Sequence, residues 1–178
     1  SNIFTLTEFL EEEKKNFSKD QVEYISHIHN QSKFMLDLIG ELLDVSAIES
    51  GSVQLNVEPV SLSMLIEHNI RLNKLAADKK NIRIMYTSSM SQPPVLSIDK
   101  NKIEQVLNNL ITNAVKYSPK DSIIHVELIE DNEYYISEVR DHGQGIKKEE
   151  QENLFLPFKK TSNETTGGES STGLGLYI

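Results

Sequence analysis

The spacing of apolar residues changes at Gly51, and this change limits the folds that the chain can adopt. Before Gly51, apolar residues recur every three or four positions, which is helical spacing. After Gly51, Val53, Leu55 and Val57 alternate with polar residues, which is typical of a strand, and Pro59 is expected to end it. The sequence therefore predicts two domains, a helical one over residues 1–51 and a mixed one over residues 52–178.

The helical part predicts a hairpin of two helices. The first helix is expected to start at or before residue 1 and to end in charged residues before a turn at residues 16–20. Ser18 and Gln21 resemble a capping box that opens a second helix of roughly eight turns. The apolar stripe of this second helix is wider than one partner helix can cover. We therefore expect a second copy of the chain to complete a helical bundle.

The mixed part alternates predicted strands with predicted helices. Asp99 is expected to cap a helix that ends before Pro119. Helices are expected at residues 61–78 and 99–117, and strands at residues 53–57, 82–86, 95–98, 124–128 and in a run that ends at Asp141. This succession predicts an α+β fold, a two-layer α/β sandwich in which helices cover one face of a mixed sheet.

The composition excludes several partners and chemistries. The 178 residues include 18 Lys plus Arg, 27 Asp plus Glu and no cysteine, with a formal net charge of -9. A negative surface repels nucleic-acid phosphates and anionic lipid head groups, so neither is an expected partner. The lack of cysteine rules out disulfides and thiolate metal sites. No run of about 18 apolar residues exists, so we expect no membrane contact from this chain, which could still be the soluble part of a membrane protein.

The predicted helix 99–117 has a polar face that its apolar face does not explain. Asn109, Asn113, Lys116 and Tyr117 lie three or four positions apart and so point the same way. An asparagine oxygen suits a magnesium ion that keeps most of its waters, and a lysine one turn later can meet the phosphates that such an ion bridges. A solvated helix face is the alternative explanation for this pattern.

Two glycine turns offer further binding chemistry. Asp141, Gly143 and Gly145 follow a predicted strand, where the glycines let the backbone approach a flat ligand and the carboxylate can accept from an exocyclic amine. The second turn, Thr172 to Gly175, leads into a predicted helix start whose free N–H groups can bind phosphate. Each turn by itself could be purely structural.

Between these turns lie an apolar segment and a polar loop. Phe155 and Phe158 are expected to anchor the near end of the loop, with a role in the core as the alternative. Residues 159–172, here called the lid, are too weakly apolar to pack and are expected to be mobile and disordered without nucleotide.

The order of these motifs resembles the ATP-binding domain of sensor histidine kinases, which is related to the gyrase, Hsp90 and MutL ATPases. The resemblance covers about residues 52–178 and implies a Bergerat-type fold that binds ATP and Mg²⁺. It assigns Asp141 to the adenine amine, Asn113 to magnesium, and Asn109 and Lys116 to catalysis. The residues that it implies at the nucleotide are Asn109, Asn113, Lys116, Tyr117, Asp141, Gly143, Gly145, Phe155, Phe158, Lys160, Thr172, Gly173, Leu174 and Gly175.

Residues 1–50, particularly residues 38–51, resemble the dimerisation and histidine-phosphotransfer hairpin of the same family. This likeness implies a homodimer and a response-regulator receiver domain as partners, in the cytoplasm or as the cytoplasmic part of a membrane-anchored sensor. His27 and His29 do not fit the family's acceptor pattern, because Ile28 and Asn30 follow them where an acidic residue is expected. We therefore expect the hairpin to be truncated and the phosphoacceptor to be absent, and the ATP-binding domain to be incomplete after Ile178.

The implied activity is transfer of the γ-phosphoryl group of ATP to a histidine and then to a response-regulator aspartate. In the related hydrolases a glutamate activates water one helical turn before the magnesium asparagine, and here Asn109 stands in that place. An amide cannot act as a general base near neutral pH, which favours transfer to an external nucleophile. A non-catalytic ATP-dependent partner switch remains an alternative, and a gyrase- or Hsp90-like ATPase is disfavoured by Asn109 and by the hairpin.

Overall fold

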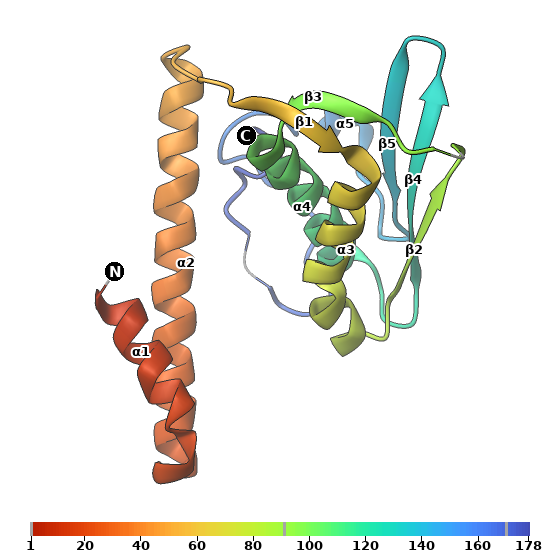
Figure 1. The fold of residues 1–178 in the computed structure, drawn as a ribbon. Coiled ribbons are helices and arrows are strands. Elements are labelled where there is room, and N and C mark those ends of the chain that lie inside the picture. Colours follow the sequence, from red (N-terminus) through yellow and green to blue (C-terminus); the bar gives the residue numbers. More distant parts are fainter. Residues whose placement is uncertain (1, 91, 170) are drawn as a thin grey trace. The chain divides into compact units, whose positions relative to one another are not determined.

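The chain folds into two compact units, Ser1–Ser52 and Val53–Ile178. The computed structural model describes residues 2–90, 92–169 and 171–178 (Figure 1). The predicted domain boundary near Gly51 lies beside the division between the units. Among the helices of the described residues, none combines the length and apolar character that a bilayer crossing requires.

The first unit is a helical hairpin of α1 (Asn2–Glu12), a short 3-10 helix (Lys14–Asn16) and α2 (Lys19–Glu49). The predicted capping box is present: the Gln21 N–H donates to Ser18 Oγ at 3.3 Å and the Ser18 N–H donates to Gln21 Oε1 at 2.9 Å. The Phe4 ring stacks on His29 with centroids 4.7 Å apart, which joins α1 to α2. The expected start of the first helix at residue 1 lies outside the described residues.

The hairpin leaves many large apolar side chains exposed. On α1 and α2 these are Ile3, Leu6, Phe9, Leu10, Tyr24, Ile28, Phe34, Met35, Ile39, Leu42 and Leu43. Two helices in contact along one line cannot bury a stripe of this width. The wide apolar stripe that the sequence predicts is therefore present as exposed surface of this unit.

The second unit contains two separate sheets. Its elements are β1 (Val57–Ser61), α3 (Leu62–Lys79), β2 (Arg83–Ser88), β3 (Val95–Asp99), α4 (Lys100–Tyr117), β4 (Ile123–Asp131), β5 (Tyr134–Arg140) and α5 (Lys148–Gln151). β2 pairs with β4 in parallel and β4 pairs with β5 antiparallel, so the mixed sheet is confirmed for these three strands. β1 and β3 form an antiparallel pair of their own.

The first strand of this unit corrects the sequence prediction. Residues 53–56 are not a strand, and β1 instead includes Pro59, which was expected to end it. Proline lacks the N–H that a central strand needs, but it is tolerated where one side of the strand is unpaired. In the sheet of β1 and β3, Pro59 pairs with Ser97 and the other side of β1 has no partner strand among the described residues, so proline is tolerated there.

The core of the unit lies between the three-stranded sheet and two helices. Figure 1 shows α3 and α4 on one face of this sheet. Ile124, Val126 and Leu128 alternate along β4 and are fully buried, whereas the residues between them are only half-buried. From α4, Leu107 and Ile111 meet this surface. The expected two-layer packing of helices on one face of a sheet is therefore present.

A ladder of amide and hydroxyl groups fixes the rotation of α4 against α3. Asn73 Nδ2 donates to Asn108 Oδ1 at 2.9 Å, and Thr112 Oγ1 donates to Asn73 Oδ1 at 2.9 Å. Successive helical residues are about 100° apart around the axis. Because Asn108 and Thr112 face α3, the next residues, Asn109 and Asn113, are turned toward another side of the helix.

One carboxylate starts α4 and fixes the segment before β1. Asp99 Oδ1 accepts from the Lys102 N–H at 3.1 Å, and Asp99 Oδ2 accepts from the Asn56 N–H at 2.8 Å. The hydrogen bond from Asn56, followed by that from Lys102, holds the pKa of Asp99 below its ordinary value of 3.8. The predicted cap is confirmed, and it has a second partner that the sequence does not reveal.

We predict that Asp99→Ala lowers the urea midpoint of the second unit at neutral pH, because two backbone donors lose their acceptor. Because the pKa of Asp99 is lower in the folded chain than in the unfolded chain, the ionised carboxylate stabilises the fold fully above pH 3.8, its ordinary pKa. This stabilisation disappears as the pH falls through the lower pKa of the folded state. The difference between variant and parent should therefore shrink below that pH. Asp131→Ala, at the exposed end of β4, is the control, and a gap that stays constant down to about pH 3 would contradict the assignment.

Candidate functional site

The polar face of α4 carries the four residues that the sequence selects. Asn109, Asn113, Lys116 and Tyr117 are all partly buried, as expected for a helix face at the wall of a site. Asn109 Nδ2 donates to the carbonyl oxygen of Gly175 at 2.8 Å. This bond joins α4 to the second glycine turn, 66 residues later in the chain.

The first glycine turn follows β5 and packs against the end of α4. Asp141 Oδ1 accepts from the Gly143 N–H at 2.7 Å, so the carboxylate closes its own turn. A Cβ atom at Gly143 would lie 2.8 Å from Asp141 Oδ1 and 3.0 Å from the Tyr117 carbonyl oxygen. A side chain at residue 143 would crowd the Tyr117 carbonyl, so the absence of a Cβ lets this turn lie against the last residue of α4. Gly145 has a φ of 69°, a conformation that glycine adopts without strain.

The second glycine turn is anchored by a buried leucine. Leu174 is fully buried, and Thr172 Oγ1 accepts from its N–H at 3.3 Å. Gly173 has a φ of 77°, and a Cβ there would lie 2.8 Å from the Lys159 carbonyl oxygen, so the two ends of the lid meet at this point. The Leu174 carbonyl accepts from the N–H groups of Tyr177 and Ile178, which forms a single turn where the sequence predicts the start of a helix.

Phe155 and Phe158 do not pack as the sequence predicts. Their exposed fractions are 68% and 57%, so they are neither core residues nor a buried anchor. Phe158 also has a φ of 61°, which is rare for a bulky residue. The chain adopts this conformation where it turns toward Gly173. The contact to Gly173 is made by the backbone of residues 158–159, not by the aromatic rings. Lys160 is exposed.

The near half of the lid rests on polar contacts with the first glycine turn and α5. Asn163 Nδ2 donates to the Gly145 carbonyl oxygen. The Ser162 N–H donates to Glu150 Oε1 at 2.9 Å, and this bond holds the pKa of Glu150 below its ordinary value. The lid is therefore held by hydrogen bonds, which a search for apolar residues could not find.

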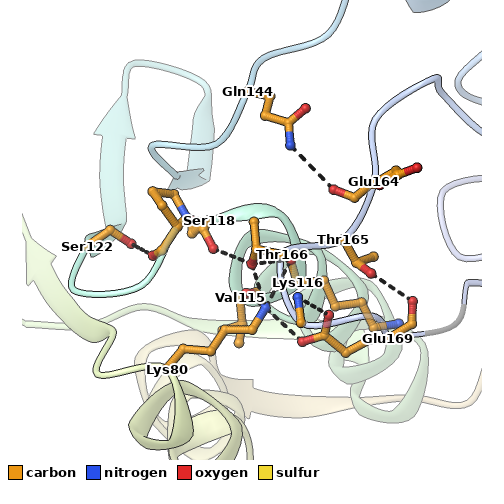
Figure 2. Close-up of polar contacts among 12 residues, drawn as sticks. Lys80, Val115, Lys116, Ser118, Ser122, Gln144, Glu164, Thr165, Thr166 and Glu169 are labelled. Carbon is orange, nitrogen blue, oxygen red and sulfur yellow. Dashed lines mark hydrogen bonds and ion pairs between the residues drawn. The ribbon is translucent and has the colours of Figure 1, made fainter.

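The far half of the lid is held by a buried lysine that the sequence analysis missed. Figure 2 shows Lys80, at the end of α3, directed at Thr166, Glu169 and the last turn of α4. Burial raises the pKa of Glu169, but the hydrogen bond from Lys80 leads the effects that lower it, and the net pKa lies below its ordinary value. In the sequence Lys80 follows Lys79 at a helix end, where a solvated lysine is the ordinary expectation.

The structure therefore brings together α4, both glycine turns and the lid. The donors and acceptors of the selected residues are two amides, an ammonium group, a phenol, one carboxylate and backbone N–H groups, which suit a ligand with a polar ring and phosphates. Among the described residues, no group of three or more His, Asp or Glu side chains could hold a metal ion. A divalent cation here would thus need ligands from the phosphates and water, with an asparagine oxygen added.

Comparison with known proteins identifies this arrangement. Residues 98–178, which include α4, both glycine turns and the lid, match the family described as histidine kinase-, DNA gyrase B-, and HSP90-like ATPase. The chain is 35% identical over 166 residues to the sensor protein EvgS of Escherichia coli K12, covering 90% of this chain and 14% of that protein. It is 32% identical over 159 residues to the circadian input-output histidine kinase CikA of Synechococcus elongatus, covering 89% of this chain and 21% of that protein.

Solved structures show the same fold. The Acinetobacter baumannii histidine kinase AdeS matches with a TM-score of 0.71 and 24% identity over 99% of this chain and 79% of that one. Full-length ShkA in complex with AMPPNP matches with a TM-score of 0.75 and 20% identity over 99% of this chain and 39% of that one. Histidine kinase ThkA in complex with the response regulator protein TrrA matches with a TM-score of 0.65 and 23% identity over 91% of this chain and 48% of that one.

The fold and the site define the ATPase domain that histidine kinases share with DNA gyrase B and HSP90. With relatives that match along about nine tenths of its length, the chain belongs to the sensor histidine kinases. It covers about a fifth or less of the length of these two relatives.

Proposed function

We propose that residues 53–178 bind ATP with Mg²⁺ and that the protein transfers the γ-phosphoryl group to a histidine outside this chain, for relay to a response-regulator aspartate in the cytoplasm. The observation that supports this most directly is the hydrogen bond from Asn109 to Gly175, because it draws the asparagine helix and the second glycine turn to one place. The close approach of Gly143 to the end of α4 adds the first turn to the same site.

Each residue of the site has a proposed role in nucleotide binding. Asp141 accepts from the adenine amine, and Asn113 supplies an oxygen ligand to Mg²⁺, which neutralises phosphate charge when bound. Asn109, Lys116 and Tyr117 lie on the phosphate side, and the backbone N–H groups near Gly173 bind phosphate oxygens. The remaining proposed contacts are Gly143, Gly145, Phe155, Phe158, Lys160, Thr172, Leu174 and Gly175.

The chemistry of Asn109 favours transfer over hydrolysis. Its amide donates to the Gly175 carbonyl and cannot take a proton from water near neutral pH. The residues of this site therefore orient the phosphates, and the acceptor histidine itself supplies the nucleophile. The alternatives are a partner switch, in which ATP sets only the shape of the lid, and a gyrase- or Hsp90-like ATPase, which Asn109 disfavours.

The histidines of the hairpin do not suit the role of acceptor. His29 stacks on Phe4, and its Nδ1 lies 3.2 Å from Thr7 Oγ1. His27 is exposed on α2, with Glu23 at 3.9 Å one turn away. His29 therefore has a packing role and His27 is an ordinary surface residue, so we propose that neither accepts phosphate.

We predict that the chain dimerises through its hairpin, because the exposed apolar residues of α1 and α2 form a surface that a second copy can cover. Sedimentation at increasing concentration should show a dimer mass. Paired Leu42→Asp and Leu43→Asp substitutions should return a monomer, because both side chains are exposed in the isolated hairpin and charges at a bundle core are unfavourable. A monomer mass at every concentration of the unaltered chain would contradict the proposal.

We predict that Asp141→Asn weakens ATP binding by roughly 1–3 kcal/mol, because an amide N–H₂ would face the adenine amine. The asparagine oxygen can still accept from the Gly143 N–H, so the turn should persist. Calorimetric titration measures the effect, with Asp131→Asn as a control of equal charge change outside the site. Equal affinity in the two variants would remove Asp141 from the pocket.

We predict that the chain binds ATP but does not label itself with γ-labelled ATP, because no histidine of this sequence is followed by the acidic residue that the family's acceptor has. Adding a hairpin helix that carries the acceptor histidine, on the same chain or on the partner of a mixed dimer, should give acid-labile, base-stable labelling. Asn113→Ala in the extended chain should remain unlabelled because the Mg²⁺ ligand is lost. Labelling of His27 or His29 would refute the missing acceptor, and an unlabelled extended chain would favour the partner switch.

A further inference from the structure

Lys80 makes an unusual set of contacts for a lysine. Its side chain is only 8% exposed, and Nζ donates to the carbonyl oxygens of Val115 and Lys116, each at 3.0 Å. The same atom donates to Thr166 Oγ1 at 2.8 Å and lies 2.7 Å from Glu169 Oε1. Two of these groups belong to the last turn of α4, and two belong to the lid (Figure 2).

The lid is folded tightly around this amine. The Thr166 N–H donates to the Lys116 carbonyl at 3.0 Å, and Thr166 Oγ1 donates to the Ser118 carbonyl at 2.7 Å. The Gly167 N–H donates to Glu169 Oε2 at 3.0 Å. A Cβ at Gly167 would lie 2.7 Å from Glu169 Oε1, so a side chain at residue 167 would push the carboxylate aside. Ser170 lies outside the described residues.

We infer that Lys80 is a positioning residue for the nucleotide lid, and that with Thr166 and Glu169 it anchors the middle of the lid to the carboxyl end of α4 before nucleotide binds. We call these three residues the lid anchor. The inference rests on the proposed function, because the lid has a role only if the site binds ATP. It differs from the expectation that the whole lid is mobile without nucleotide, which stays a prediction.

Charge and burial explain why the anchor requires the lid. The carbonyl oxygens at the end of a helix carry partial negative charge and attract an ammonium group, but they do not neutralise it. A buried ammonium group without an anionic partner is strongly unfavourable. Within the described residues, the carboxylate that pairs with Lys80 is that of Glu169, and it comes from the lid. Docking of the lid and burial of the lysine are therefore coupled.

The anchor should favour nucleotide binding. A loop that is already ordered loses less conformational entropy when it closes on a ligand than a disordered one does. With residues 165–169 fixed, only the flanking segments have to rearrange around the nucleotide. Loss of the anchor should therefore speed the dissociation of ATP.

The decisive experiment measures amide hydrogen exchange at Thr166 and Gly167 in the nucleotide-free 178-residue chain. Glu169→Gln keeps the shape of the side chain and removes its charge, so exchange at both amides should rise about tenfold. Glu164→Gln, the same charge change at an exposed position of the same lid, should leave both rates unchanged. Unchanged exchange in Glu169→Gln, at an unchanged melting temperature, would overturn the inference.

A second measurement links the anchor to the nucleotide. Stopped-flow release of a fluorescent ATP analogue with Mg²⁺ should be several-fold faster in Glu169→Gln and in Lys80→Met than in Glu164→Gln. Faster exchange with slower release would mean that the anchor holds the lid in a blocking position, which would refute the proposed role. If no variant and no parent chain binds the analogue, the proposed function fails, while the exchange experiment still decides whether the anchor exists.

Discussion

The burial of one face of α4 is the constraint on which the site depends. Leu107, Ile111 and Ala114 are held in the core against the sheet, so the helix cannot rotate without exposing them. The ladder to α3 adds a second restraint, because Asn73 bonds to Asn108 and Thr112 together. The polar face of α4 is thereby presented to the glycine turns as a fixed wall rather than as a flexible surface.

The parts of this arrangement that follow from local rules were predictable. The position of α4 follows from its apolar period and its Asp99 cap, and the turn at Gly143 follows from glycine placed directly after a strand. The face of α4 that carries Asn109 follows from helical spacing alone. These features depend on residues within a few positions of each other, where sequence patterns carry the information.

The parts that sequence reasoning missed depend on distant partners. Pro59 was expected to end a strand, but the pairing of β1 with β3 alone makes it acceptable. Phe158 was expected to anchor the lid through its ring, yet its backbone makes the contact and the ring is exposed. Lys80 and Glu169 are 89 positions apart in the sequence, and the residues beside each of them form no motif that predicts their contact. Polar contacts of this kind leave no periodic signal.

Attachment of the lid at residue 166 also changes how its two flanks can vary. The penalty for closing a flexible loop grows only with the logarithm of its length, and it applies separately to each segment between fixed points. One segment runs from the backbone contact at Lys159 to Thr166, and the other runs from Glu169 to the contact at Gly173. Insertions in one flank should therefore leave the geometry of the other unaltered, so that the two halves of the lid can diverge independently among related proteins.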